Sequence, residues 1–270
     1  QHGLADTEIK IPEDTKLLLI PDAGSNDVQQ CRELREKYMD IIILDHHVMD
    51  VENPFAVVVN NQDGSYPNKE LSGAGVVYKF CQVVDDTTWN NFANKYLDLA
   101  AIGNIGDNMD LRSLETKYIA MNGMVQIMNP CIQAVVDNNG YKVQNPPTII
   151  DIQFYVVPAM NALIRVGTQA QKQRMFEALT YSKNIYQYTP TRGKNAGKTL
   201  NLTAGEYSAK EMASAKYKQN KEKEKAIEEI IKRIDQFGLA KNKILFCNVN
   251  GILNPSLTGV VAINIAQMYN

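Results

Sequence analysis

Two short apolar runs, each ending in residue types that bind metals, constrain the fold of this 270-residue chain most. The first run, residues 16–20, leads into Asp22, and the second, residues 40–44, leads into the triplet at residues 45–47. Apolar residues at helical spacing between the runs predict a helix over residues 27–38. A strand, a helix and a second strand at this spacing predict a βαβ unit with parallel strands.

The residues at the strand ends are candidate metal ligands. In open parallel sheets a ligand binds beyond the carboxyl ends of the strands, where Asp22 and His46 lie in this prediction. A third carboxylate, Asp107, follows a predicted helix and a glycine-rich turn at residues 103–106. Two carboxylates and an imidazole suit Mn²⁺ or Mg²⁺ better than thiolate-seeking metals. A lone histidine pair is more often structural, but its place at a strand end favours a site.

The rest of the chain continues the α/β pattern. We expect a third strand at residues 55–60 and one more strand-like segment far downstream, at residues 243–249. A glycine- and lysine-rich loop is expected at residues 190–200, and a long polar helix with a narrow apolar stripe at residues 208–237. The other expected helices cover residues 76–84, 91–102, 115–137, 168–184 and 259–270.

Composition excludes several classes of protein. Hydrophobic residues make up 44% and charged residues 21%, which is globular and argues against a disordered, collagen-like or coiled-coil chain. We find no apolar run near the roughly 18 residues of a membrane span and no signal peptide, so we expect no membrane partner. The four cysteines lie far apart, which fits reduced thiols and a cytoplasmic location.

Charge is distributed unevenly along the chain. Residues 1–150 hold 21 acidic and 11 basic residues, whereas residues 183–270 hold 7 acidic and 14 basic residues. This asymmetry suggests that the front half binds cations and that the back half faces a polyanion. Chance variation in the charge of solvent-exposed helix faces would also produce it. A basic stretch could follow a nucleic-acid backbone or simply solubilise a linker: Arg192, Lys194, Lys198, Lys210, Lys216 and Lys218. Tyr181, Tyr186 and Tyr188 could stack on unpaired bases, but ordinary packing is the more common use.

Five motifs in order resemble the DHH phosphoesterase superfamily, and within it the RecJ-type single-strand-specific exonucleases. The strand ending in Asp22 with Ala23 and Gly24, the triplet at residues 45–47 and the Gly-x-Ile-x-Asp segment at 103–107 match the metal motifs. The segment at residues 71–76 and the Pro-x-x-Asn-Ala-x-x-Arg segment at 158–165 favour the RecJ branch.

The resemblance implies a domain organisation. Residues 1–200 would form the DHH phosphoesterase domain, an α/β domain with a parallel sheet and helices on both faces. Residues 201–238 would form a linker helix, and residues 239–270 the start of a second, smaller α/β domain. The family's first Asp-x-Asp motif and most of the DHH-associated domain do not occur in residues 1–270, so the resemblance implies a fragment that by itself could be inactive.

The resemblance also implies a function: metal-dependent hydrolysis of single-stranded DNA from an end, 5′ to 3′, in repair or recombination. Two ions of Mn²⁺ or Mg²⁺ would be held in the complete protein by ligands that include Asp22, His46 and Asp107. Asp45 would orient an imidazole, and His47 would touch the scissile phosphate. The substrate-binding residues would be Arg165, Asn161, Ser72 and Gly73, and a salt bridge that braces the fold is an equal alternative for Arg165.

The motifs leave alternatives open. Other DHH enzymes hydrolyse pyrophosphate, short oligoribonucleotides or cyclic dinucleotides with the same metal site, so the triplet at residues 45–47 does not separate them. A non-catalytic replication scaffold is a further alternative, because the first motif does not occur in this chain. A single-strand-binding protein or a helicase would be the expected protein partner of a RecJ-type nuclease.

Overall fold

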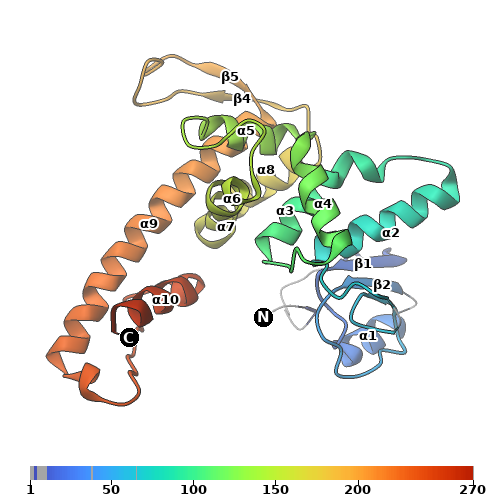
Figure 1. The fold of residues 1–270 in the computed structure, drawn as a ribbon, viewed down its shortest axis with the longest axis horizontal. Helices are drawn as coiled ribbons and strands as arrows, with labels where there is room; N and C mark the ends of the chain where they lie inside the picture. The colour runs from blue at the N-terminus through green and yellow to red at the C-terminus, as the bar shows by residue number, and fades with distance from the viewer. Residues whose placement is uncertain (1–2, 5–10, 38, 65, 270) are drawn as a thin grey trace. The chain divides into compact units, whose positions relative to one another are not determined.

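A computed structural model describes residues 3–4, 11–37, 39–64 and 66–269 of the chain (Figure 1). Contacts divide it into two compact units. The first comprises residues 1–129 and 140–154, and the second comprises residues 130–139 and 155–270. The assignment of residues 1–200, 201–238 and 239–270 to functional domains stays a prediction.

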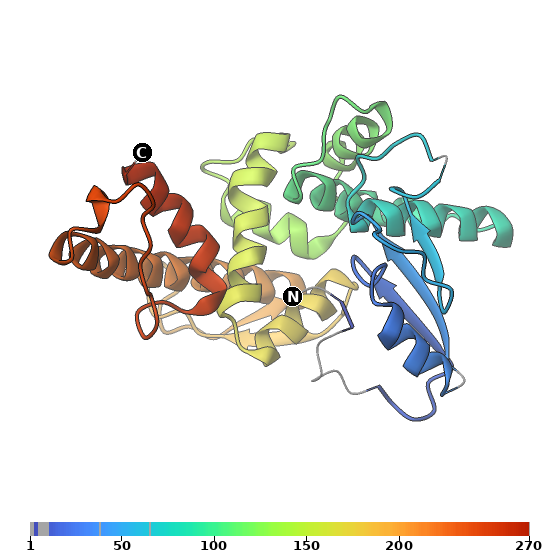
Figure 2. The same ribbon diagram turned by 90° about the horizontal axis from the view of Figure 1, so that it is seen from below.

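A three-stranded parallel sheet forms the first part of the first unit. Strands β1 (Leu17–Pro21), β2 (Asp40–Asp45) and β3 (Val57–Asn60) lie side by side in the order β1-β2-β3. β-Branched and leucine side chains dominate all three, which suits a pleated and partly buried surface. Helices lie on both faces, with α1 (Val28–Arg35) on one and α2 (Gly73–Thr88) on the other (Figures 1 and 2). The α/β class and the parallel sheet are thus confirmed.

A small core joins the sheet to α1. Ile20, Ile41 and Ile43 point from β1 and β2 into this core, where they meet Cys31 of α1. Ile43 and Cys31 are fully buried. The register pairs Ile20 with Ile43, so the two strands end side by side. The expected helix at residues 27–38 is shorter in the structure, and Tyr38 lies outside the described residues.

Helices complete the first unit. They are η1 (Ala93–Tyr96), α3 (Leu97–Gly106), α4 (Leu114–Val125) and α6 (Ile149–Asp151), and the π-helical turn η2 (Ile152–Val156) crosses to the second unit. The expected turn at residues 103–106 is wrong, because these residues form the last turn of α3 and Asp107 caps it. Gly103 does not break α3 but lets it approach α2, since a Cβ atom there would lie 2.5 Å from the Cβ atom of Ala74.

The second unit is built around one long helix. Its elements are α5 (Pro130–Asn138), α7 (Val157–Val166), α8 (Gln169–Leu179), β4 (Ile185–Tyr188), β5 (Leu200–Thr203), α9 (Ala204–Gln236), η3 (Leu239–Lys241), η4 (Pro255–Leu257) and α10 (Thr258–Tyr269). The N-terminal part of α9 packs against α5, α7 and α8, and the part near Ile230 and Ile234 packs against α10 (Figure 1).

Three further expectations need correction. The helix expected at residues 115–137 is two helices, because Gln126 is extended and Pro130, which has no N–H, starts a new helix. The segment at residues 243–249 forms no strand, since none of the described strands lies beside it as a pairing partner. The loop at residues 190–200 joins an antiparallel hairpin of β4 and β5 that we did not expect.

In the described part of the chain, one helical stretch is apolar enough to cross a membrane by length and composition alone, and α4 and α5 pass the same test only as a pair bent by 73°. Residues 149–166 span 18 residues with a mean hydropathy of 1.4, contrary to our expectation that no such run exists. Core helices of soluble proteins pass the same test, and Ala159, Ala162 and Leu163 in this stretch are buried within the protein. The stretch is therefore weak evidence for a membrane span.

The close packing of α3 on α4 generates a stability prediction. A Cβ atom at Gly123 of α4 would lie 2.5 Å from the Cβ atom of Ala101 and 2.6 Å from the carbonyl oxygen of Leu97. Because backbone cannot give way as a flexible side chain can, we expect Gly123→Ala to lower the free energy of unfolding by about 1–3 kcal/mol in urea denaturation. Gly259→Ala in α10, where a Cβ meets nothing within 4 Å, is the control and should not destabilise. Equal stability of the two variants would contradict the packing argument.

Candidate metal centre

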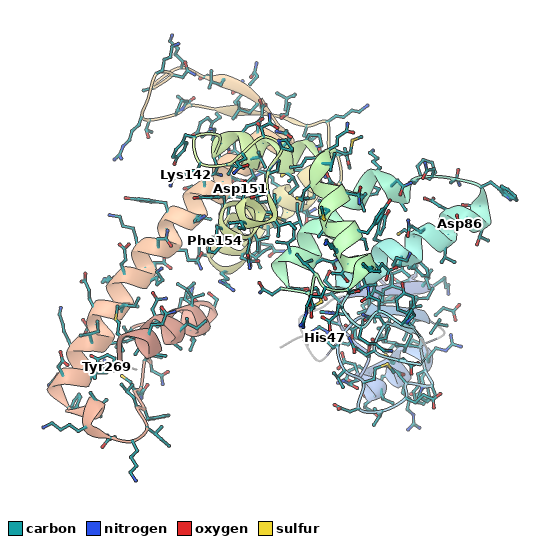
Figure 3. The ribbon with its side chains drawn as sticks, viewed as in Figure 1. His47, Asp86, Lys142, Asp151, Phe154 and Tyr269 are labelled. Atoms are coloured by element: carbon teal, nitrogen blue, oxygen red, sulfur yellow. The ribbon has the colours of Figure 1, made fainter. Side chains whose placement is uncertain are left out.

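The ends of β1 and β2 bring three candidate ligand residues together. Asp22 follows β1 directly, with a positive φ of 63°, and its backbone N–H donates to the carbonyl of Leu44. Asp45 is the last residue of β2, and His46 and His47 follow it (Figure 3). The parallel register places these two ends at the same edge of the sheet. The strand-end argument from the sequence therefore agrees with this arrangement.

His46 lies between two carboxylates. Its Nε2 atom is 3.2 Å from Oδ1 of Asp22 and 4.0 Å from Oδ2 of Asp107. Asp107 reaches this point as the C-cap residue of α3. The His46 side chain is 13% exposed, whereas the two carboxylates are about half exposed, so the group opens to solvent on the carboxylate side.

These surroundings shift two pKa values. The hydrogen bond to Asp22 raises the pKa of His46 above its usual value, against burial, and the charges of Asp22, Asp107 and Asp45 add to the rise. Burial raises the pKa of Asp107, and the charge of Asp22 raises it further. Both shifts favour the protonated form of the group concerned.

Asp45 is the buried anchor of the segment. Its Oδ1 atom accepts hydrogen bonds from the backbone N–H of His46 at 2.8 Å and of His47 at 3.3 Å, and it lies 2.7 Å from Nδ1 of His47. Its Oδ2 atom accepts from the backbone N–H of Ser25. Burial raises the pKa of Asp45, but these hydrogen bonds outweigh burial and hold the pKa below its usual value. Asp45 thus stays ionised and fixes the His47 ring.

The donor set fits a hard divalent cation. One ligand atom each from Asp22, His46 and His47 lie within 4.8 Å of one another. Nδ1 of His47 faces Asp45, which leaves Nε2 as the outward atom of a ring that is 47% exposed. Carboxylate oxygens suit Mn²⁺ or Mg²⁺, and the lack of a thiolate in this group argues against thiolate-seeking metals. Asp107, whose Oδ2 atom lies 4.0 Å from the same Nε2 atom of His46, adds a carboxylate to this set.

The N-terminus of α2 packs closely against Asp22. A Cβ atom on Gly73 would lie 2.2 Å from Oδ1 of Asp22, so only glycine fits there without a shift. Ser72 is fully buried, and its hydroxyl accepts from the backbone N–H of Gly75 and donates to Oδ1 of Asn104. The backbone N–H of Ser72 donates to the same oxygen. Ser72 is therefore placed to position the turn, and its side chain does not reach the surface.

Two residues that support the site were missed in the sequence analysis. Asn104 lies one helical turn before Asp107 in α3, so its bonds to Ser72 link the position of α2 to that of Asp107. Asn60, the last residue of β3, donates to the hydroxyl of Ser25 and to the backbone carbonyl of His47. A polar residue at the end of the third strand was the available signal for Asn60. Asn104 lies inside the Gly-x-Ile-x-Asp segment at residues 103–107, but it occupies a variable position of that segment, so the motif did not single it out.

Arg165 and Asn161 lie in the other compact unit. Both are exposed residues of α7, and the backbone carbonyl of Arg165 accepts from the hydroxyl of Ser256. Within the described residues Arg165 makes no ion pair with a carboxylate, so the alternative of a bracing salt bridge has no support there. The role of both residues in substrate binding stays a prediction.

The residues of the basic stretch lie partly on the β4–β5 hairpin and partly on α9, and two of the tyrosines lie on β4. Arg192, Lys194 and Lys198 lie in the exposed loop of the β4–β5 hairpin, and the remaining lysines lie on α9. Two of those lysines have internal partners, since Lys210 donates to Asn138 and Lys218 pairs with Glu222. Tyr186 stacks on Tyr207 of α9 with ring centroids 4.9 Å apart, and Tyr188 meets the same ring edge-on. These two tyrosines therefore pack the hairpin onto α9.

The raised pKa of His46 generates a pH prediction. Replacing Asp22 with Asn removes the main cause of the rise, so the His46 pKa should fall in an NMR titration of the metal-free protein. A raised folded-state pKa stabilises the fold below the ordinary value of 6.5, and this stabilisation disappears as the pH rises through the folded-state pKa. Asp22→Asn should therefore cost more stability at pH 5.5 than at pH 8.

The matched control for this titration is Asp40→Asn, at the opposite end of β2, where the carboxylate pairs with Arg35. This variant removes the same charge and should leave the His46 pKa unchanged. A His46 pKa that moves equally in both variants would mean that Asp22 acts only through net charge.

Comparison with known proteins identifies relatives of this chain. Residues 3–104 match the DHH family, N-terminal domain. Across its full length the chain is 36% identical to a putative SPbeta prophage-derived single-strand DNA-specific exonuclease, YorK, of Bacillus subtilis, and covers 46% of that protein. Over 94% of its length it is 26% identical to the single-stranded-DNA-specific exonuclease RecJ of Bacillus subtilis, and covers 29% of it. The chain thus spans less than half the length of the curated relatives it matches.

Solved structures show the same fold. An exonuclease RecJ bound to manganese superposes with a TM-score of 0.74 at 20% identity, over 95% of this chain and 60% of that one. RecJ from Thermus thermophilus in complex with Mn²⁺ gives a TM-score of 0.73 at 21% identity, over 95% of this chain and 35% of that one. Residues 3–104 therefore match the N-terminal domain of the DHH family, and the chain as a whole is similar in sequence to RecJ single-strand-specific exonucleases.

Proposed function

We propose that this chain carries the catalytic half-site of a metal-dependent phosphodiesterase that hydrolyses single-stranded DNA from an end. The observation that carries the proposal is the convergence of Asp22, His46 and Asp107 at one edge of the sheet, with His47 beside them. The names of the relatives, single-strand DNA-specific exonucleases, support the substrate. Mn²⁺ or Mg²⁺ fits the donor set.

Each residue of the site has a role in this proposal. A bound divalent ion would supply a water of lowered pKa and an electrophile for the phosphoryl oxygens. Asp22, His46 and Asp107 would hold such an ion. Asp45, fixed by three backbone N–H groups, orients His47 with its Nε2 atom outward, where the ring can donate to a phosphate oxygen. Ser72 and Gly73 position α2 so that Asp22 has room.

Finer features of the proposal rest on the resemblance to RecJ-type nucleases. They are a pair of metal ions, a 5′-to-3′ direction, a role in DNA repair or recombination, a cytoplasmic location, and a single-strand-binding protein or a helicase as partner. The complete pair of ions needs ligands beyond the residues named here. Each feature is open to direct test once hydrolysis is established.

The ligand assignment predicts the effect of two substitutions. Asp22→Ala and His46→Ala should each abolish Mn²⁺-dependent cleavage of an end-labelled single-stranded oligonucleotide, because each removes a ligand of the site. Calorimetry should show the matching loss of Mn²⁺ binding. Asp40→Ala, an exposed carboxylate at the start of β2, is the control and should retain both. Turnover that survives in either ligand variant would refute the assignment.

A comparison of substrates separates the alternatives. We expect release of nucleotides from single-stranded DNA to exceed hydrolysis of pyrophosphate, of a short oligoribonucleotide and of a cyclic dinucleotide. Preference for one of those three would reassign the chain to another DHH activity. No hydrolysis of any of them, with Mn²⁺ binding also absent, would favour the non-catalytic scaffold.

The anchoring role of Asp45 predicts a graded loss. Asp45→Asn keeps the size of the side chain but removes the charge that accepts four hydrogen bonds. Partners of this kind typically contribute about 10–100-fold in metal affinity or activity, so we expect a loss in that range. Because the group is buried, the unfolding transition should be measured alongside. Full activity in a folded variant would show that the His47 ring needs no anchor.

A further inference from the structure

Hydrogen bonds within α3 fix the chain on one side of Asp107. Asp107 ends α3, and Asn108 after it has a positive φ of 55°. The backbone N–H of Asn108 donates to the carbonyl of Ile105 at 3.2 Å. The backbone N–H of Met109 donates to the carbonyl of Asn104 at 3.0 Å, and the two bonds together form a Schellman C-cap. The helix itself therefore sets the start of the turn that carries Asp107.

Glu70 holds the other end of this turn. Its Oε2 atom accepts a hydrogen bond from the backbone N–H of Asp110, three residues after Asp107, at 3.2 Å. The carboxylate of Asp110 has a partner of its own, because it accepts from the backbone N–H of Arg112 at 2.9 Å and from its guanidinium at 2.8 Å. A carboxylate is a stronger acceptor than a neutral oxygen. The main chain of the turn at residues 107–110 is thus tied to a side chain from another segment.

Glu70 can act as an anchor because its own backbone is fixed. Its N–H donates to Oδ1 of Asn68 at 2.9 Å, and its carbonyl accepts from the hydroxyl of Thr116 in α4. Asn68 is buried, and its amide group donates to Oε2 of Glu115, also in α4, at 2.9 Å. Side chains that are not ligands of the metal centre therefore hold the segment with Glu70 on α4.

The same segment leads directly to the part of α2 that packs against Asp22. Ser72, two residues after Glu70, is the N-cap of α2. Glu70 therefore connects the backbone beside Asp22 to the backbone after Asp107. This connection is separate from the hydrogen bonds between Ser72 and Asn104, which lie before Asp107 in α3.

We infer that Glu70 is a positioning residue of the metal centre, which fixes the turn after Asp107 and so sets the distance between its carboxylate and His46. The Asp107 side chain is about half exposed, so the position of its backbone largely decides where the carboxylate lies. The inference rests on the proposed function, because it takes Asp107 as a ligand of a divalent ion. In this role Glu70 needs no contact with the ion or with the substrate.

The test compares two uncharged replacements of Glu70 by calorimetric titration of the full chain with Mn²⁺. Glu70→Gln keeps an oxygen that can accept from the N–H of Asp110, whereas Glu70→Met has a similar length and no such oxygen. Glu70→Met should weaken Mn²⁺ binding about 10-fold, the lower end of the range for partners that orient a ligand, and Glu70→Gln should stay within about twofold of the wild type. Equal Mn²⁺ affinities in the two variants would overturn the positioning role.

Gln62→Met is the matched control for general loosening of the segment. The Gln62 amide donates to the backbone carbonyl of Lys69 at 2.8 Å, beside Glu70, so this bond lies within the segment itself. The variant should lower stability in urea and leave Mn²⁺ binding unchanged. Protection of the Asp110 amide from hydrogen exchange should fall in Glu70→Met alone. A loss of Mn²⁺ affinity in Gln62→Met as large as that in Glu70→Met would overturn the inference.

Hydrolysis of single-stranded DNA with Mn²⁺, measured in parallel, keeps the inference apart from the proposed function. Cleavage by the wild type, with equal Mn²⁺ binding by the wild type and Glu70→Met, would refute the positioning role and leave the proposed function standing. Weaker Mn²⁺ binding in Glu70→Met alone, in a chain that cleaves nothing, would support the positioning role while the proposed function fails. A wild type that binds no Mn²⁺ would overturn both.

Discussion

The arrangement at the edge of the sheet depends on the buried carboxylate of Asp45. Three backbone N–H groups and the His47 ring converge on it, and together they hold its pKa low despite burial. A buried charge without such partners would be expelled or protonated. The bonds to Ser25 and to residues 46–47 therefore set the path of the chain after β2 and place His46 opposite Asp22.

A second polar constraint holds the helices against this edge. Asn104 of α3 accepts two hydrogen bonds from Ser72, the residue that caps α2, and Asp107 lies one turn further along α3. The close approach of Gly73 to Asp22 depends on this link. Gly73 and the buried amide of Asn104 thus fix the positions of α2 and α3, as Asp45 fixes the chain after β2. The exposed ligand atoms therefore belong to residues whose backbone positions are fixed by buried hydrogen bonds and close packing.

The two compact units differ in charge and in the chemistry that they present. The first gathers carboxylates and imidazoles at the strand ends, where a cation would balance them. The second presents Arg165 on α7 and Lys223 on α9. Neither side chain makes an ion pair with a carboxylate among the described residues. A phosphodiester substrate needs both kinds of surface, since its phosphates are attracted by cations and its reacting phosphate by a metal. In the proposed function each unit supplies one of these surfaces by itself.

The sequence by itself determined the parallel sheet and the position of Asp22, Asp45 and the histidine pair at its edge. Local pattern suffices there, because a buried strand is a short apolar run and its end is marked by the first polar residues. The same reasoning failed at residues 103–106, where glycines allow helices to approach and do not break α3, and at residues 243–249, where an apolar run has no strand beside it.

Only the tertiary structure decided how side chains far apart in sequence meet. The bonds of Asn60 and Asn104, the room that Gly73 leaves for Asp22, and the burial of Ser72 all depend on packing between elements that local pattern does not encode.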